Sequence, residues 1–209
     1  MRRIVTEWFR VPRVWPHVEK HLAGLDRPLV VWSGGCGTGE EPYSAAIMLE
    51  ELGIPGRVVA TDLDEQLLAI ARQGEYSRRN ITLNLDERRL TTQQVGQYFD
   101  YADGRYTVRA EIRQRVDFAV GALGTDQPPQ CDVAFVRNVW RHLGAAVQRR
   151  LAAQVHECLP ADGLLLLGGG DLMTQDPITL ELKEIEPAGL SQYFAESREH
   201  ELIWRPREG

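Results

Sequence analysis

A glycine-rich loop and one acidic residue carry the clearest chemistry in the sequence. The loop runs from Ser33 to Glu40 as SGGCGTGE, and Gly35, Gly37 and Gly39 let its backbone approach a ligand where a Cβ would collide. Asp62 stands 23 residues beyond the last of these glycines, at the end of an apolar run. A carboxylate in that position accepts hydrogen bonds from both ribose hydroxyls of an adenosine. The pattern therefore predicts a bound nucleoside.

The same loop disfavours a phosphate. The dinucleotide pattern GxGxxG needs a third glycine, but counting from either pair of glycines puts Glu40 or Pro42 there. The carboxylates of Glu40 and Glu41 would suit the positive end of a helix and repel a pyrophosphate. The loop fits a cationic nucleoside without phosphate, and S-adenosylmethionine is that cofactor, with S-adenosylhomocysteine as its product.

The loop glycines and Asp62 also have a purely structural interpretation. The glycines would then only make a turn, and Asp62 would cap the next helix. Asp64 competes for the capping position, which favours the binding interpretation. Cys36, inside the loop, is expected to be a small packing residue, because neighbouring carboxylates oppose a thiolate.

The elements that must position these residues alternate along the chain. Apolar runs predict strands, and three- and four-residue apolar spacing predicts helices. Strands are expected at residues 29–33, 57–61, 116–120, 132–136 and 164–167, helices at 40–52, 64–73 and 145–159, and a hairpin from 193–197 and 200–204. This order predicts an α/β fold, a doubly wound sheet with an antiparallel last strand. We expect a single domain over residues 1–209, with a small subdomain inserted at 75–115, where the alternation is lost.

Composition excludes several classes of protein. The 209 residues are 43% hydrophobic and 26% charged, as in one soluble globular domain. A formal charge of −6 argues against a nucleic-acid partner, and no apolar run is long enough to insert in a membrane. The three cysteines are too widely spaced for a disulfide framework or a CxxC clip, so a cytoplasmic location is expected. His17 and His21 have no third ligand near in sequence, so no metal site is expected.

The segment WSGGCGTGEEPYS, residues 32–44, closely resembles the glycine loop of the CheR family, chemotaxis receptor methyltransferases that esterify glutamate side chains. Around it, TEWFR at 6–10 is similar to the family's T-x-F-F-R segment, and further matches extend over nearly the whole chain. These are ATDLD at 60–64, GEY at 74–76, YF at 98–99, VDF at 116–118, RNV at 137–139 and LPADG at 159–163.

The resemblance implies the seven-stranded class I methyltransferase fold and a set of cofactor contacts. The positions that match the family's pocket are Thr6, Arg10, Glu40, Asp62 and Asn138. Arg10 can form a bidentate pair with the methionine carboxylate, and the acidic start of the helix after the loop can meet the ammonium. Asp62 remains the ribose ligand.

The sequence departs from the family pattern more at positions expected near the methyl acceptor than at positions expected near the cofactor. The family usually has a helical basic domain before the T-x-F-F-R segment, whereas this chain starts almost at Thr6, so we expect a catalytic domain only. Leu123 stands in the Ala-Leu pair that replaces the family's Asn-Leu, so one polar cofactor contact is lost. His142 occupies the position of the tyrosine beside the transferred methyl group, and residues 168–171 read GGGD instead of Gly-x-Ser-Glu.

Three functions remain open for such a site. A protein carboxylate is ionised at neutral pH and needs no base, which favours a receptor-type carboxyl methyltransferase. A small-molecule hydroxyl would need a base, and His142 is the histidine placed for it; Arg10 and His142 are thus the candidate catalytic residues. The third possibility is a non-catalytic S-adenosylmethionine-binding module. If residues 75–115 form an antiparallel sheet with an exposed edge, a peptide could dock by strand addition, whereas a closed lid would indicate a small acceptor.

Overall fold

The computed structural model describes residues 6–175 and 181–207. The chain divides into two compact units, the first comprising Met1–Leu29 and Cys36–Val120 and the second Val30–Gly35 and Gly121–Gly209. The expected single domain over residues 1–209, with its insertion at 75–115, stays a prediction.

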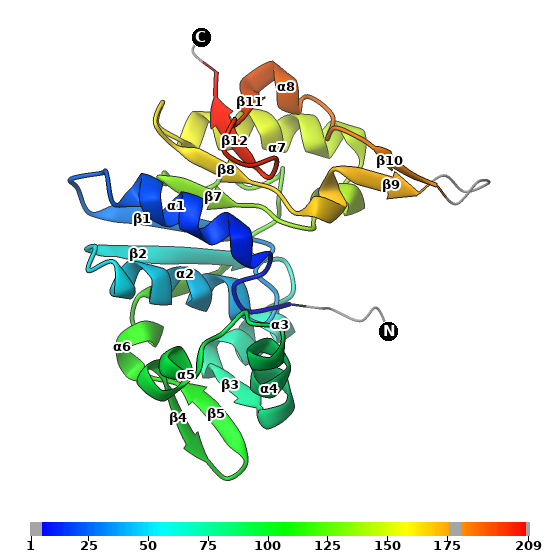
Figure 1. Cartoon of the computed structure of the whole chain (residues 1–209). Coiled ribbons are helices and arrows are strands. Elements are labelled where there is room, and N and C mark those ends of the chain that lie inside the picture. Colours follow the sequence, from blue (N-terminus) through cyan, green and yellow to red (C-terminus); the bar gives the residue numbers. More distant parts are fainter. Residues whose placement is uncertain (1–5, 176–180, 208–209) are drawn as a thin grey trace. The chain divides into compact units, whose positions relative to one another are not determined.

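The first unit contains two parallel strands with helices packed against them, and a separate small sheet (Figure 1). Its strands are β2 (Gly56–Asp62), β3 (Glu75–Ser77), β4 (Phe99–Ala102), β5 (Arg105–Val108) and β6 (Val116–Val120). Its helices are η1 (Pro12–Val14), α1 (Trp15–Leu22), α2 (Glu40–Glu51), α3 (Glu65–Gln73), α4 (Arg78–Asp86), α5 (Thr92–Tyr98) and α6 (Ala110–Arg113). β2 runs parallel to β6, with Val58 opposite Val116 and Asp62 opposite Val120.

Residues 75–115 contain a small antiparallel sheet of the kind that would allow strand addition. The order is β3-β5-β4, with Tyr76 and Tyr101 both opposite Tyr106. Figure 1 shows these strands together with α4 and α5. Within the described part of the chain β4 pairs with β5 alone, and only Phe99 of its residues is buried. The sheet therefore ends in an exposed edge strand.

Local sequence rules explain how several helices of this unit begin and end. Asp64 caps α3 by accepting hydrogen bonds from the Gln66 and Leu67 amides, and Gly74 ends that helix in a left-handed conformation, as predicted. Thr91 and Gln94 form a capping box at the start of α5. These helices start where the sequence supplies an oxygen for the free amides.

The second unit contains the other strands of the α/β fold. Its strands are β1 (Leu29–Gly34), β7 (Val133–Phe135), β8 (Leu164–Leu166), β9 (Met173–Gln175), β10 (Leu182–Glu184), β11 (Phe194–Glu196) and β12 (Ile203–Pro206). Its helices are η2 (Trp140–His142), α7 (Ala145–Cys158), η3 (Gly169–Asp171) and α8 (Leu190–Tyr193).

The strand directions in this unit match the prediction. β1 is parallel to β7 and β7 to β8, with Ala134 opposite both Trp32 and Leu165. β12 is antiparallel to both β8 and β11, so the predicted C-terminal hairpin and antiparallel last strand are confirmed. The α/β fold with mostly parallel strands, expected for class I methyltransferases, is confirmed as well.

One hairpin was not predicted. β9 and β10 pair antiparallel as a separate two-stranded sheet, with Met173 opposite Glu184. Figure 1 shows this hairpin extending from the remainder of the second unit. Each strand is three residues long, too short for the two-residue alternation that identifies a strand in sequence.

Candidate functional site

The glycine loop of the first unit bends around the end of β2. The Gly37 amide donates to Asp62 Oδ2 at 2.8 Å, and the Cys36 amide donates to the Thr61 carbonyl at 3.0 Å. Gly37 and Gly39 have φ angles of 58° and 98°, in the left-handed region that favours glycine. The structure thus brings the loop glycine Gly37 and the predicted ribose ligand into direct contact.

Asp62 has acceptor capacity left for a ligand. Its Oδ2 accepts the loop amide and its Oδ1 accepts the Asp64 amide at 3.0 Å. A carboxylate has about four lone-pair sites, so each oxygen retains one for a further donor. Asp64 rather than Asp62 caps α3, so Asp62 does not have the capping role. Its role as a ribose ligand stays a prediction. The half-buried carboxylate fits the two hydroxyls of a ribose.

Glu40 is the centre of a buried hydrogen-bond network. Its side chain is 3% exposed. Thr6 and Thr38 lie within 2.6 and 2.7 Å of its Oε2, their hydroxyls are 2.6 Å apart, and the Asn80 amide donates to its Oε1 at 3.1 Å. The predicted residues Thr6 and Glu40 are therefore in contact, and the carboxylate links the start of α2 to two distant segments.

Asn80 is a member of this network that the sequence analysis missed. Its side-chain oxygen accepts from Trp8 Nε1 at 2.9 Å while its amide donates to Glu40. Trp8 is fully buried, with ring centroids 4.9 Å from Tyr76 and 5.0 Å from Phe99. Asn80 lies in the polar stretch after residue 75, where nothing in the sequence pattern marks it. It joins α4 to the N-terminal segment.

Arg10 lies in a strained stretch of backbone. Phe9 and Val11, on either side of it, have φ angles of 40° and 54°, which are uncommon for side chains of this size. Phe9 is held there by a hydrogen bond from its amide to Ser44 Oγ at 2.9 Å. The Arg10 guanidinium is 3.4 Å from the Glu7 carboxylate and 30% exposed. Such strain is characteristic of functional segments, and the role of Arg10 stays a prediction.

In the second unit, both the backbone conformation and the neighbouring side chains favour glycine at position 35. Its φ is 75°, and a Cβ there would lie 2.7 Å from Val139 and 3.7 Å from Leu123. The second unit therefore places Leu123, a predicted cofactor contact, beside a loop glycine. The contact it offers is apolar.

Asn138 is fixed by an aspartate that the sequence analysis did not select as a site residue. Asn138 has a φ of 59°, and its amide donates to Asp171 Oδ2. The same oxygen accepts from the Gly168 amide at 2.9 Å, and a Cβ on Gly168 would collide with Asn138. Asp171 is 1% exposed. Burial raises the pKa of its carboxyl, although these amides and the nearby Arg141 oppose the shift.

His142 is exposed at the end of η2, and Arg141 Nε donates to its Nε2 at 3.4 Å. In the neutral ring that bond uses the lone pair of Nε2. Its proposed role as a base stays a prediction.

The cysteines are buried. Burial, together with the charges of Asp62 and Glu41, raises the pKa of the Cys36 thiol far above its usual range, as expected for a packing residue. Cys131 and Cys158 are free thiols whose sulfurs lie 3.9 Å apart, a proximity that their sequence separation concealed. Over the described ranges, no cluster of three potential metal ligands occurs, and none of the helices is long and apolar enough to cross a bilayer.

Comparison with known proteins identifies relatives over most of the chain. Residues 5–201 match the family model described as CheR methyltransferase, SAM binding domain. The chain is 31% identical over 206 residues to chemotaxis protein methyltransferase 1 of Pseudomonas aeruginosa, covering 87% of this chain and 71% of the relative. It is 34% identical over 175 residues to the chemotaxis protein methyltransferase of Escherichia coli K12, covering 78% of this chain and 59% of the relative. The chain thus spans about two thirds of the length of these relatives.

A solved structure supports the fold alone. The PH0226 protein of Pyrococcus horikoshii OT3 aligns with a TM-score of 0.50 at 14% identity, covering 95% of this chain and 90% of that one. The family match, the relatives and the carboxylate at the glycine loop agree, and the chain belongs to the CheR methyltransferase family, with S-adenosylmethionine as its cofactor.

Proposed function

We propose that this chain transfers a methyl group to a glutamate carboxylate of a chemotaxis receptor. The names of the relatives support a chemotaxis methyltransferase. The observation that favours a protein acceptor over a small molecule is the exposed edge of β4, in a sheet that the first unit forms from residues 75–77 and 99–108. A receptor segment would add to that edge as a further antiparallel strand. The proposal places the reaction in the cytoplasm, which suits three free cysteines.

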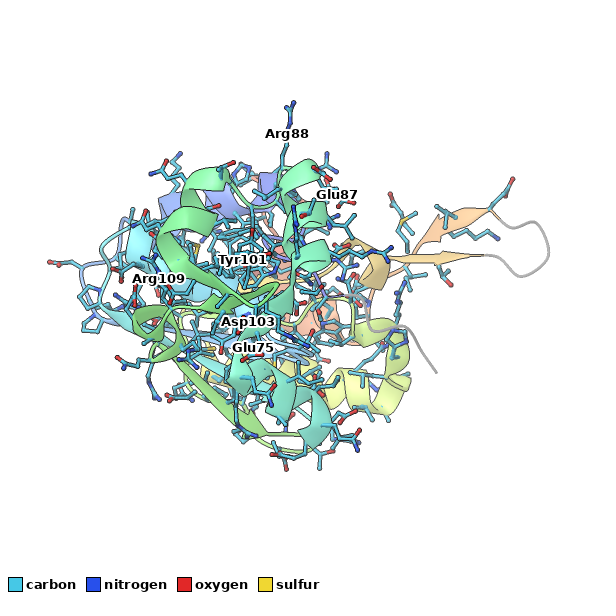
Figure 2. All side chains as sticks on the ribbon, turned by 90° about the horizontal axis from the view of Figure 1, so that it is seen from below. Glu75, Glu87, Arg88, Tyr101, Asp103 and Arg109 are labelled. Atoms are coloured by element: carbon cyan, nitrogen blue, oxygen red, sulfur yellow. The ribbon has the colours of Figure 1, made fainter. Side chains whose placement is uncertain are left out.

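The proposed docking edge combines one exposed aromatic side chain with charges. Tyr101 is 54% exposed, and Asp103, which Figure 2 labels with it, follows β4 in the turn to β5. Arg109 pairs with Asp100 of the same strand at 3.0 Å. An exposed tyrosine on an edge strand provides apolar contact while the backbone provides hydrogen bonds.

The residues of the site have distinct tasks in this reaction. The cofactor supplies a methyl group already activated on a sulfonium. Asp62 accepts from the ribose hydroxyls and orients the nucleoside, and Arg10 pairs with the amino-acid carboxylate. Glu40 holds Thr6, and therefore the start of the Arg10 segment, against α2. A carboxylate acceptor is already ionised, so alignment and exclusion of water are sufficient and His142 need not act as a base.

The test is methylation of receptor cytoplasmic domains with S-adenosylmethionine labelled in the methyl group. We expect incorporated label that base releases, as methyl esters do. Base-stable label, or no transfer to any receptor domain while S-adenosylhomocysteine still binds, would contradict the proposal.

The docking edge has a separate test. Tyr101→Ala should raise KM for the receptor about tenfold and leave the affinity for S-adenosylhomocysteine unchanged, because a tyrosine anchor contributes about 1–2 kcal/mol. Ile70→Ala, which truncates a 45% exposed side chain on α3, is the matched control. Equal KM values for the two variants would refute docking at this edge.

A further inference from the structure

A groove in the second unit contains none of the residues predicted to bind the cofactor. Its volume is about 580 Å³, and its lining includes Leu172, Ile185 and Leu202. Ligand pockets typically measure about 300–1,000 Å³. A groove of this size suits a short peptide segment or a small molecule.

Two hairpins supply the sides of the groove, and each presents an apolar residue paired with a glutamate. Met173 of β9 lies opposite Glu184 of β10, and Trp204 of β12 lies opposite Glu196 of β11. All four residues line the groove. Opposite residues of antiparallel strands point to the same face. Each hairpin therefore presents one apolar side chain and one glutamate to the groove, and we call these glutamates, Glu184 and Glu196, its acidic margin.

The acidic margin is not neutralised by the groove itself. Glu186 and Glu201 also line it, and no lysine or arginine is found among the described residues of its lining. Glu186 accepts a hydrogen bond from the Ser191 amide at 2.8 Å. Throughout residues 6–175 and 181–207, no ion pair involves Glu184 or Glu196. An occupant with positive charges would complement these four carboxylates.

Trp204 adds an observation independent of charge. The side chain lines the groove and is 7% exposed, and its Nε1 has no hydrogen-bond partner among the described residues. A buried donor without an acceptor costs about 1–3 kcal/mol. An oxygen acceptor that reaches Nε1 would recover this cost, and a peptide carbonyl is such an acceptor.

We propose that this groove binds a short basic peptide segment of another protein, with apolar side chains on its floor and lysine or arginine side chains at its glutamates. The peptide class is favoured over a polyamine because a polyamine carries no acceptor for the Trp204 N–H. Leu182, opposite Gln175 on the β9–β10 hairpin and 69% exposed, extends the apolar surface beyond the groove. The site is independent of the proposed methyl transfer.

The experiment measures binding of a fluorescein-labelled KLRVK peptide to the full chain by anisotropy, with an ELEVE peptide as the charge-reversed probe. We expect saturable binding of KLRVK only. The double variant Glu184→Gln with Glu196→Gln should weaken it about tenfold, because each exposed ion pair contributes up to about 1 kcal/mol. Glu111→Gln with Glu157→Gln, exposed glutamates outside the groove, is the matched control with the same charge change.

The site of binding is read from the indole N–H resonances, with Trp204→Phe identifying the signal of Trp204. We expect that resonance to shift when the peptide is added. Equal binding of ELEVE, an unchanged affinity in the groove double variant, an unmoved Trp204 signal, or displacement by spermidine at equal concentration would each overturn the proposal. Calorimetry with S-adenosylhomocysteine should give the same affinity for wild type and the groove variant, which separates this test from that of the proposed function.

Discussion

Replacing Asp171 tests whether one buried carboxylate fixes the loop that carries Asn138. In Asp171→Ala the amides of Asn138 and Gly168 lose their acceptor at a site that is 1% exposed. Each unsatisfied buried donor costs about 1–3 kcal/mol, so the free energy of unfolding should fall by about 2–6 kcal/mol. Asp171→Asn keeps an oxygen with two lone pairs in the same place. We expect its free energy of unfolding to fall by no more than about 2 kcal/mol.

The measurement is urea unfolding followed by tryptophan fluorescence, with Glu157→Ala as the control. Glu157 is exposed on α7, so its truncation should change stability by less than about 0.5 kcal/mol. We also expect the alanine variant to bind S-adenosylhomocysteine less tightly, because the Asn138 backbone loses its anchor. Equal stability of the alanine and asparagine variants would refute the assignment of Asp171 as the acceptor that holds this loop.

The pH dependence gives an independent test of the same carboxyl. Burial raises the pKa of Asp171 in the folded protein above its ordinary value of 3.8, so the folded state binds this proton more tightly than the unfolded state. The resulting stabilisation is fully present below pH 3.8 and is lost as pH rises through the raised pKa. Wild type should therefore lose stability relative to Asp171→Asn, which does not titrate, as pH rises above that value. A pH-independent difference would contradict burial as the dominant cause.

Three further outcomes follow from the site. Calorimetry with Asp62→Ala should show at least about tenfold weaker binding of S-adenosylhomocysteine, because hydrogen bonds to a charged acceptor contribute about 1.5–3 kcal/mol each; an unchanged affinity would remove the ribose assignment. His142→Phe should retain its kcat, because a carboxylate acceptor needs no base; a large loss of kcat would indicate that the acceptor is a hydroxyl instead. Cys36, Cys131 and Cys158 are buried, so a chromogenic disulfide should label native protein far more slowly than urea-unfolded protein; one rapidly labelled thiol in native protein would contradict this.

The parts of the fold that sequence predicts are those set by short-range rules. The loop glycines, the cap at Asp64 and the stop at Gly74 each depend on residues within a few positions of one another. Asp62 could be predicted as a ribose ligand because strand and loop lengths are regular in α/β units. The resemblance to the CheR family supplied Thr6 and Arg10, which no local pattern marks.

The residues that sequence missed act over long separations. Asn80 contacts Glu40 across 40 positions, and Asp171 holds Asn138 across 33. Neither has a periodic pattern or a spacing rule, because each is selected by the fold that brings its partners together. Asp171 was noted only as a departure from a family motif. Its structural role becomes evident once the positive φ of Asn138 and its buried acceptor are known.

The hydrogen bonds of the loop explain why its chemistry differs from that of a phosphate-binding loop. A phosphate site needs backbone amides directed at the ligand. Here the amides of Cys36, Gly37 and Gly39 already donate to the Thr61 carbonyl, the Asp62 carboxylate and the Cys36 carbonyl. The glycines therefore bend the loop against a carboxylate, and the ligand meets acceptors where a nucleotide site would offer donors. A nucleoside with hydroxyls to donate and a positive charge satisfies that arrangement, and a diphosphate does not.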